Sequence, residues 1–280
     1  MNNELERVKE FSRENIVVSA KAGTTIEDIA KFYKISQAQV ELILEMSKEN
    51  LMDSQKLKQL REEVVVIHNK ILQVCEGKPV LKNVYKGCII YLSPVYKNPD
   101  IMFFGINPGG GYFGTTGKII QEFDPQITQT HEGIDFYRDF ERVCQKLNKT
   151  HLYKNMVKTN RYFFATNNTK NFEKFFNLLP LEFHWEVAQK QEEWTRTLIS
   201  EISPKLIIAG GKTIWTKFNK LYPNPQCLEE GKHTKVLKIN DIPLIAYERV
   251  RNKMLDTDEF FQIFNRYTEN FTVDMNIKEK

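Results

Sequence analysis

The stretch Ile101–Gly114 reads IMFFGINPGGGYFG and decides the fold that we expect. Its first four residues, Ile101 to Phe104, are apolar, as in a strand of a parallel sheet that is covered on both faces. A glycine-rich turn follows directly at the carboxyl end of this strand. Because open α/β sheets bind their ligands at the carboxyl ends of the strands, we expect a ligand site at this turn.

The turn offers one aimed side chain, the amide of Asn107, on an otherwise bare backbone. Pro108 has a fixed φ and biases Asn107 towards an extended conformation. The glycines Gly109–Gly111 let backbone N–H groups approach a ligand without an intervening Cβ, and Tyr112 and Phe113 could stack on a flat ring. Two simpler interpretations are open: Asn107 satisfies only its own turn, as Asn often does, and the two aromatic residues pack in the core.

Further apolar segments follow the same plan, and segments with apolar residues at helical spacing lie between most of them. These strand-like segments are Cys88–Leu92; Arg161–Ala165, which ends in TNNTK; Lys205–Ala209, which ends in GGKT; and Pro243–Ala246, which leads into YERVR. Strands that alternate with helices predict a three-layer α/β/α sandwich with a central parallel sheet. The polar strand ends would then gather at one edge of that sheet.

The first sixty residues instead predict a small helical unit. Thr25 is an N-cap candidate for one helix, and Ser36 begins a second helix after a short break. This order outlines a helix-turn-helix. The second helix offers Gln37, Gln39 and Glu41 on its exposed side but no basic residue, so packing or a protein contact is the alternative to DNA reading.

The chain therefore divides into a helix-turn-helix-like unit at residues 1–60, a connecting helix at 61–84 and an α/β domain at 85–280. The composition, with 41% hydrophobic and 27% charged residues, is that of an ordinary globular protein. No window approaches the roughly 18 uninterrupted apolar residues of a membrane helix, and the polar N-terminal segment does not resemble a secretory signal. We expect a cytoplasmic protein without membrane contact.

The four cysteines are scattered, with no C-x-x-C pair. This spacing argues against a structural zinc or iron–sulfur site and indicates reduced thiols, so we expect no metal.

Positive charge is concentrated in the C-terminal half. Residues 146–174 contain seven Lys or Arg against one acid, and residues 205–253 contain ten against four. Such an excess is expected if a polyanion passes over that surface. Ordinary solvated helix faces would give part of the same excess.

Two nucleotide-binding motifs are matched only formally. Gly109–Gly114 fits G-x-G-x-x-G, but a Pro precedes the glycines and a loop rather than a helix follows them, unlike the dinucleotide fingerprint. Gly211-Lys212-Thr213 resembles the end of a P-loop, but Leu206 stands where that loop requires a glycine. We therefore expect no nicotinamide, flavin or nucleoside triphosphate, and no cofactor.

Taken together, the strand ends GINPG, TNNTK, AGGKT and AYERVR resemble those of the uracil-DNA glycosylase superfamily. The nearest motif is that of the mismatch-specific and single-strand-selective branches, whose first site motif reads GINPG or GMNPG. The resemblance covers about residues 85–265 and leaves the helical unit outside.

The resemblance implies a role for each matching residue. Asn107 would position the attacking water, Phe113 or Tyr112 would stack on the flipped base, and Asn167 or Asn168 would read its pairing edge. An enzyme that acts on a base must take it out of the stack and hold it by stacking and by hydrogen bonds to that edge. The rest of the base site would be formed by Gly105, Ile106, Pro108 and Gly109.

One motif departs from the superfamily. A His-Pro-Ser type loop follows the last strand in much of the superfamily, whereas this chain has Tyr247–Lys253, YERVRNK. Arg249 and Arg251 would bind phosphate there or fill the vacated position of the flipped base, and Lys212 would bind phosphate at the neighbouring strand end. The departure leaves open a weaker enzyme, a changed base specificity, or a member that binds without cutting.

The sequence thus predicts a DNA glycosylase-like protein that hydrolyses the N-glycosidic bond of a damaged, mismatched or modified base. The alternative is a catalytically weak or inactive protein of the same fold that binds nucleic acid or a partner in a regulatory or defence role. DNA is the expected partner of the enzyme, and the N-terminal helices could recruit a protein.

Overall fold

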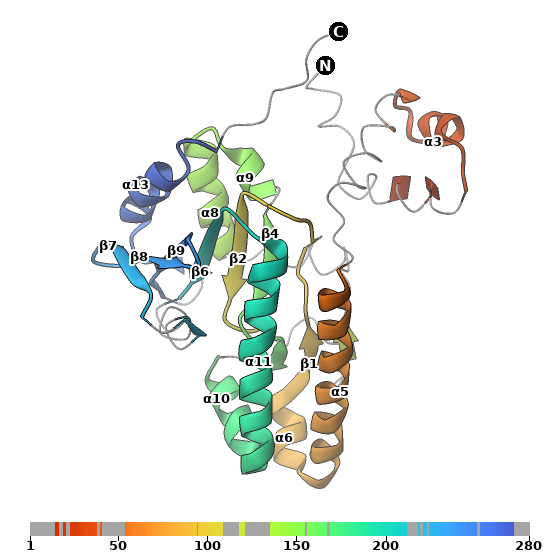
Figure 1. Ribbon diagram of the computed structural model, residues 1–280, viewed down its shortest axis with the longest axis vertical. Coiled ribbons are helices and arrows are strands. Elements are labelled where there is room, and N and C mark those ends of the chain that lie inside the picture. Colours follow the sequence, from red (N-terminus) through yellow and green to blue (C-terminus); the bar gives the residue numbers. More distant parts are fainter. Residues whose placement is uncertain are drawn as a thin grey trace. The chain divides into compact units, whose positions relative to one another are not determined.

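The computed structural model (Figure 1) describes residues 15–16, 19–20, 23–37, 40, 54–93, 95–108, 118–120, 135–154, 156–166, 169–211, 218, 221–222, 224–250 and 253–271. The chain divides into two compact units, Met1–Met52 and Asp53–Lys280. The first described helix of the second unit begins at Gln55. The division after Met52 lies a few residues before the boundary that we predict at residue 60, and α5 belongs wholly to the second unit.

The first unit contains helix α3, Ile26–Tyr33. The predicted cap is present: Oγ1 of Thr25 accepts a hydrogen bond from N of Asp28 at 3.2 Å. The apolar face of the unit packs in a small core of Ile16, Ile29, Ala30 and Val40. Most of the second helix lies outside the described residues, so the helix-turn-helix stays a prediction.

The helices described in the second unit are α5 (Gln55–Gly77), α6 (Pro79–Val84), α8 (Asp135–Lys146), α9 (Thr150–Lys154), α10 (Thr169–Leu178), α11 (Leu181–Ile202) and α13 (Thr257–Tyr267). The two longest, α5 and α11, lie side by side and run antiparallel (Figure 1). Lys56 pairs with Glu201 near one end, and Lys70 pairs with Glu186 near the other.

A six-stranded sheet forms the centre of the second unit. Its order is β4 (Val157–Asn160), β2 (Ile101–Gly105), β6 (Leu206–Gly210), β9 (Ile242–Tyr247), β8 (Thr234–Ile239) and β7 (Gln226–Glu230). Neighbours from β4 to β9 are parallel, which confirms an α/β protein with a mostly parallel sheet.

Strands β8 and β7 are antiparallel to their neighbours, so the parallel sheet that we predict is in fact a mixed one. The hairpin that joins β8 to β9 turns at Asn240-Asp241, and both residues have positive φ. Two such residues match a tight hairpin turn, because their backbone twist follows that of the strands. This turn is the sequence signal for the missed hairpin.

A second sheet has the order β3 (Lys118–Ile120), β1 (Tyr85–Ile89) and β5 (Phe164–Thr166). The strand predicted over Arg161–Ala165 is therefore wrong in its bounds, because β4 ends before it and β5 pairs antiparallel with β1. The chain breaks between the two strands where the side chain of Arg161 turns towards α11. There its Nη1 donates to the backbone oxygen of Gln191 at 3.1 Å.

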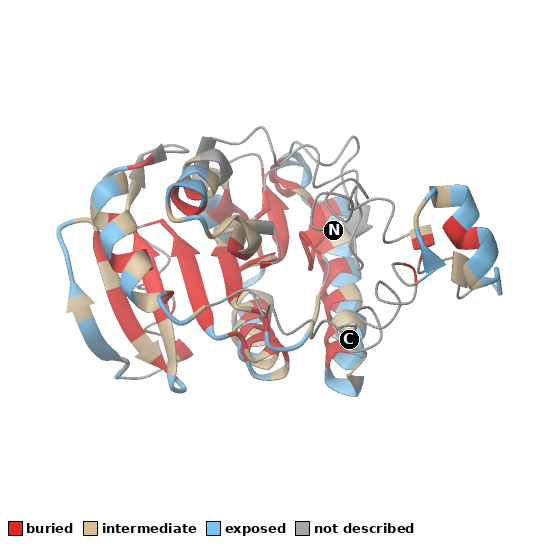
Figure 2. Ribbon diagram, turned by 90° about the horizontal axis from the view of Figure 1, so that it is seen from above, coloured by how far each residue is buried: buried red, intermediate tan, exposed pale blue. Residues whose placement is uncertain are grey.

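Helices α8 and α13 pack on one face of the six-stranded sheet, and their side chains share a buried cluster with Phe103, Ile208 and Tyr247. The central strands are buried along most of their length (Figure 2). Strand β6 is buried at every residue, as its apolar sequence predicts. Among the described residues, no helix combines the length and the apolar character needed to cross a membrane.

Candidate functional site

The carboxyl ends of β4, β2, β6 and β9 form one edge of the sheet, which we call the carboxyl edge. Gly105 of β2 lies opposite Asn160 of β4, and Gly210 of β6 lies opposite Tyr247 of β9. The GINPG, AGGKT and AYERVR stretches therefore begin at the same edge. Strand β5, which precedes TNNTK, belongs to the other sheet, and this corrects our expectation that all four ends share one sheet.

Asn107 lies two residues beyond β2, in a turn that its neighbours hold. Its Nδ2 donates to O of Pro108 at 3.1 Å and to Oγ1 of Thr166 at 3.2 Å. The first bond is the self-satisfied turn that we considered for this residue, and the second joins the end of β5 to the site. Because both amide hydrogens are engaged, the side chain presents Oδ1 as an acceptor, and no described residue donates to that oxygen.

Asn160 is a site residue that sequence reasoning missed. It is 4% exposed, and its Oδ1 lies so close over Gly105 that a Cβ at residue 105 would collide with it. Its Nδ2 has no hydrogen-bond partner among the described residues. Buried polar groups are nearly always paired, so this amide is a candidate for a ligand contact. The sequence signal that could have identified Asn160 is its place at the end of a short strand, since Asn107 of GINPG also comes at a strand end.

Two glycines allow neighbouring side chains to pack closely against the end of β6. A Cβ at Gly210 would meet the hydroxyl group of Tyr247, and Gly211 has a φ of 124°, which favours glycine. A Cβ at Gly211 would lie 3.4 Å from Cδ1 of Ile106 and 3.6 Å from Nε of Arg249. The predicted residues Ile106 and Arg249 therefore both lie beside Gly211 at the end of β6.

A short hairpin follows β9. Strand β10 (Arg249–Val250) pairs antiparallel with β11 (Lys253–Met254), and N of Met254 donates to Oδ2 of Asp139 on α8 at 3.3 Å. The hairpin is thus fastened to α8. This attachment holds Arg249, which is half-buried, at the carboxyl edge.

The far end of the carboxyl edge carries His233. It precedes β8 and is partly buried, and its Nδ1 lies 3.3 Å from Oε2 of Glu248. The carboxylate of Glu259 accepts hydrogen bonds from the backbone N–H groups of Lys232, His233 and Thr234 at 3.1, 3.0 and 2.7 Å. The protein itself therefore satisfies the backbone donors of this loop.

Several predicted site residues lie outside the described part of the chain, and their roles stay predictions: Gly109, Tyr112, Phe113, Asn167, Asn168, Lys212 and Arg251. The predicted residues that the structure does bring to the carboxyl edge are Gly105, Ile106, Asn107, Pro108 and Arg249.

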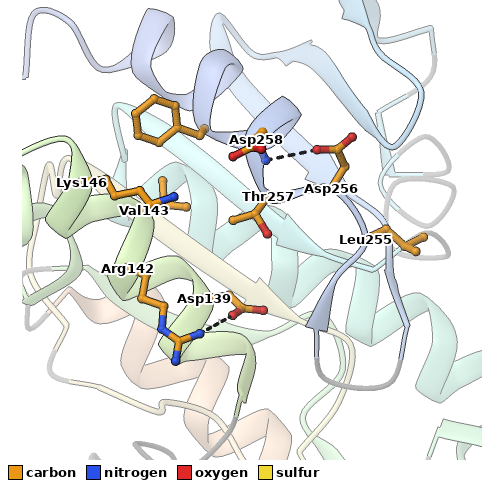
Figure 3. Close-up of a pocket in the computed structure, with 9 residues that line it drawn as sticks. Asp139, Arg142, Val143, Lys146, Leu255, Asp256, Thr257 and Asp258 are labelled. Atoms are coloured by element: carbon orange, nitrogen blue, oxygen red, sulfur yellow. Dashed lines mark hydrogen bonds and ion pairs between the residues drawn. The ribbon is translucent and has the colours of Figure 1, made fainter.

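A cavity of about 570 Å³ opens between α8 and the start of α13 (Figure 3). It is lined by Asp139, Arg142, Val143, Lys146, Leu255, Asp256, Thr257, Asp258 and Phe261. Two of its three acids have structural partners, because Asp139 accepts from N of Met254 and pairs with Arg142, and Asp256 caps α13. A smaller cavity of about 230 Å³ lies at residues 230–235 and 246–248.

Neither of these cavities is lined by Asn107 or Asn160. The buried thiols in the unit are also unsuited to chemistry. Burial raises the pKa of Cys88, and it raises the pKa of Cys144 to about 12, so both remain protonated at neutral pH and are poor nucleophiles. Within the described residues, no group of His, Cys, Asp and Glu has the arrangement of a metal site. The functional groups that the described part of the carboxyl edge offers to a ligand are therefore amides and guanidinium groups.

No protein-family model matches the sequence, and a search of the curated proteins finds no match. The function is therefore inferred from the residues of the site and from their resemblance to known motifs.

Proposed function

We propose that the chain is a DNA glycosylase-like protein that flips a damaged, mismatched or modified base and hydrolyses its N-glycosidic bond, as in DNA repair. The observation that carries the proposal is the pair of amides at the carboxyl edge. Asn107 presents Oδ1 as an acceptor, and Asn160 is buried with an unpaired Nδ2. The resemblance of GINPG to the first site motif of the uracil-DNA glycosylase superfamily supports the same function.

The two amides suit the two halves of this reaction. Cleavage leaves a cationic sugar and an anionic base, so the site needs an acceptor for the attacking water and donors that face the base. Oδ1 of Asn107 would accept from the water. Asn160 combines one donor with one acceptor, the pattern that reads a Watson–Crick edge, and it takes the role that the resemblance implies for Asn167 or Asn168.

Binding of DNA would use the positive residues beside these amides. Arg249 stands at the end of β9, next to Gly211, where it would bind a phosphate group. The N-terminal unit would be a helix-turn-helix that contacts DNA or a protein. A protein contact is supported by Phe32, which is 78% exposed on α3, because an exposed aromatic side chain suits an interface.

The proposal includes a three-layer α/β/α sandwich. Helices α8 and α13 supply one layer, and α11 supplies the other. In support, α11 binds the segment that follows β4 through Gln191 and Thr195, and neither residue belongs to the buried cluster of α8 and α13.

An abasic-site assay tests the proposal, with uracil-, hypoxanthine- and modified-cytosine-containing oligonucleotides in single- and double-stranded form. We expect wild-type protein to release a base and Asn107→Ala to do so at least about a hundredfold more slowly, as when a group that positions a reactant is lost. Asn69→Ala, on an exposed part of α5, is the matched control and should keep the wild-type rate. Undiminished release by Asn107→Ala would contradict the role of this residue.

The second candidate function is binding of altered DNA without cleavage. The observation that favours it is the segment after β9, which supplies Glu248 and Arg249 and no histidine at that strand end. DNA binding without release of a base from any of the oligonucleotides would support this function over the first.

A further inference from the structure

Arg161 is the largest charged side chain buried in the described part of the chain, and the proposed function gives it no role. It directly follows β4 and is 2% exposed. Its Nη1 donates to O of Gln191 at 3.1 Å and to Oγ1 of Thr195 at 3.0 Å, both on α11. The guanidinium group also lies over the ring of Tyr162, 4.9 Å from its centroid.

The positive charge of Arg161 has no direct counter-charge in the part of the chain that the structure describes. Among the described residues no carboxylate pairs with the guanidinium group, and its buried Nε has no hydrogen-bond partner. Burial lowers the pKa of Arg161, and Glu192 offsets part of this effect from a longer range. An arginine stays protonated in proteins even so. A buried charge is costly unless it is paired, so an unpaired one needs a functional reason.

The backbone of Arg161 is bonded to the strand that carries the proposed site. N of Arg161 donates to O of Gly105 at 2.8 Å, and N of Tyr162 donates to O of Ile106 at 2.9 Å. These two bonds continue the β4–β2 ladder past the ends of the strands. The residue that carries the charge is therefore fixed to the two residues that precede Asn107.

We infer that the uncompensated guanidinium group of Arg161 serves the carboxyl edge as a source of positive potential, which favours an anionic group bound beside Asn107 and Asn160. The inference rests on the proposed function for the identity of that group, a nucleobase that leaves as an anion. A charge in a low-dielectric interior acts over longer distances than one in water. Arg161 therefore needs no contact with the base and is a positioning residue rather than a catalytic one.

Gln191→Glu is the sharpest test, because it adds a counter-charge without changing the shape of the core. Oε1 of Gln191 accepts from N of Phe163 at 3.1 Å, and its Nε2 is buried without a partner among the described residues. A glutamate keeps the first bond and replaces the unpaired donor by a negatively charged acceptor, on the residue whose backbone oxygen accepts from Nη1 of Arg161. Thr195→Val is the matched control, because it removes a neutral partner of Nη1 and leaves the charge in place.

Two measurements separate this inference from the proposed function. The first is the single-turnover rate of base release. We expect this rate to fall about tenfold in Gln191→Glu and in Arg161→Gln. It should stay near the wild-type value in Arg161→Lys and in folded Thr195→Val, which both keep the positive charge. DNA affinity should change less than the rate. The second is the binding of free 5-nitrouracil, an anion at neutral pH, compared with neutral uracil. Wild-type protein should prefer the anion, and Gln191→Glu should lose that preference.

The outcomes are distinct. Anion preference without base release by the wild-type protein would sink the proposed enzyme and leave the role of Arg161 standing. A Gln191→Glu protein that keeps the wild-type rate and the wild-type preference would overturn the role of Arg161 while the enzyme survives. A wild-type protein that binds the two free bases equally would also overturn it.

Discussion

The two ends of the carboxyl edge differ in how their polar groups are satisfied. One end of the edge is formed by the start of β8 and the carboxyl end of β9. There Glu259 accepts hydrogen bonds from three backbone N–H groups, and Glu248 bonds to His233. At the end of β2 and β4, by contrast, Nδ2 of Asn160 and Nε of Arg161 are buried without partners among the described residues. Both ends are built on the same sheet. The first end leaves the hydroxyl group of Thr234 buried without a partner among the described residues, but its backbone donors are bonded, whereas the second end leaves donors of an amide and of a charged guanidinium group unpaired.

This difference indicates which end is prepared for a ligand. Leaving a buried donor unpaired costs more than a single hydrogen bond gains, so the fold tolerates such groups where a ligand completes them. A loop whose donors are already bonded gains little from a ligand. The end of β2 and β4 is therefore expected to control activity, and the end of β8 and β9 to control stability.

The largest effect on this comparison is expected from Asn160→Asp. A carboxylate offers only acceptors where the amide offers a donor and an acceptor, so a base with a carbonyl group opposite Nδ2 would meet repulsion. We expect the release of such a base to fall by about a hundredfold or more, because sites built on hydrogen bonds discriminate strongly. Asn69→Asp, on the surface of α5, makes the same charge change and should keep the wild-type rate. Equal rates in the two variants would show that Asn160 does not contact the base.

Gly105→Ala should have the next largest effect. The new Cβ would collide with Oδ1 of Asn160 and displace its amide, which is the flexible end of a side chain. We expect about a tenfold loss of base release, as for one weakened hydrogen bond, with little change in the melting temperature. Gly77→Ala is the control, because a Cβ at residue 77 meets no atom within 4 Å. A large loss of stability in Gly105→Ala would instead show that the close contact is only a packing constraint.

Arg249→Gln should change DNA binding rather than the chemical step. Arg249 lies beside Gly211 at the edge and would bind a phosphate group, so its loss should lower the slope of log affinity against log salt by about one. The rate at saturating DNA should stay near that of the wild type. Lys58→Gln, on the exposed side of α5, removes a positive charge away from the edge and should leave the slope unchanged. An unchanged slope in Arg249→Gln would remove this residue from the DNA path.

The strands that carry the site could be predicted because their sequences are unambiguous. Ile101–Phe104 and Leu206–Ala209 are apolar throughout, and both lie in buried parallel strands. The polar edge of the sheet was harder to predict. VKTN and FAT are short strands that lie only three residues apart and belong to different sheets. The single strand predicted over Arg161–Ala165 starts after VKTN and covers the residues between the two strands. Asn160 was hidden by this error.

Charge and burial at single positions also escaped prediction. In the sequence, Arg161 counts as one of many basic residues in a positive region, and only the contacts with α11 reveal it as a buried group. The same limit applies to strand β7, whose residues are mostly exposed and lack the alternation that identifies a half-buried strand.

Glu259→Gln should have the smallest effect on activity and tests the other end of the comparison. The amide would place an NH₂ group against three backbone N–H groups that a carboxylate now accepts. Hydrogen bonds to a charged acceptor are stronger than neutral ones, so we expect a loss of about 1 to 2 kcal/mol in the free energy of unfolding, measured with urea. Base release by the folded protein should be unchanged, because this loop lies beyond β6 and β9 from Asn107. A variant that folds with wild-type stability but releases base slowly would reverse the assignment of the two ends, since the Glu259 loop would then act on the site.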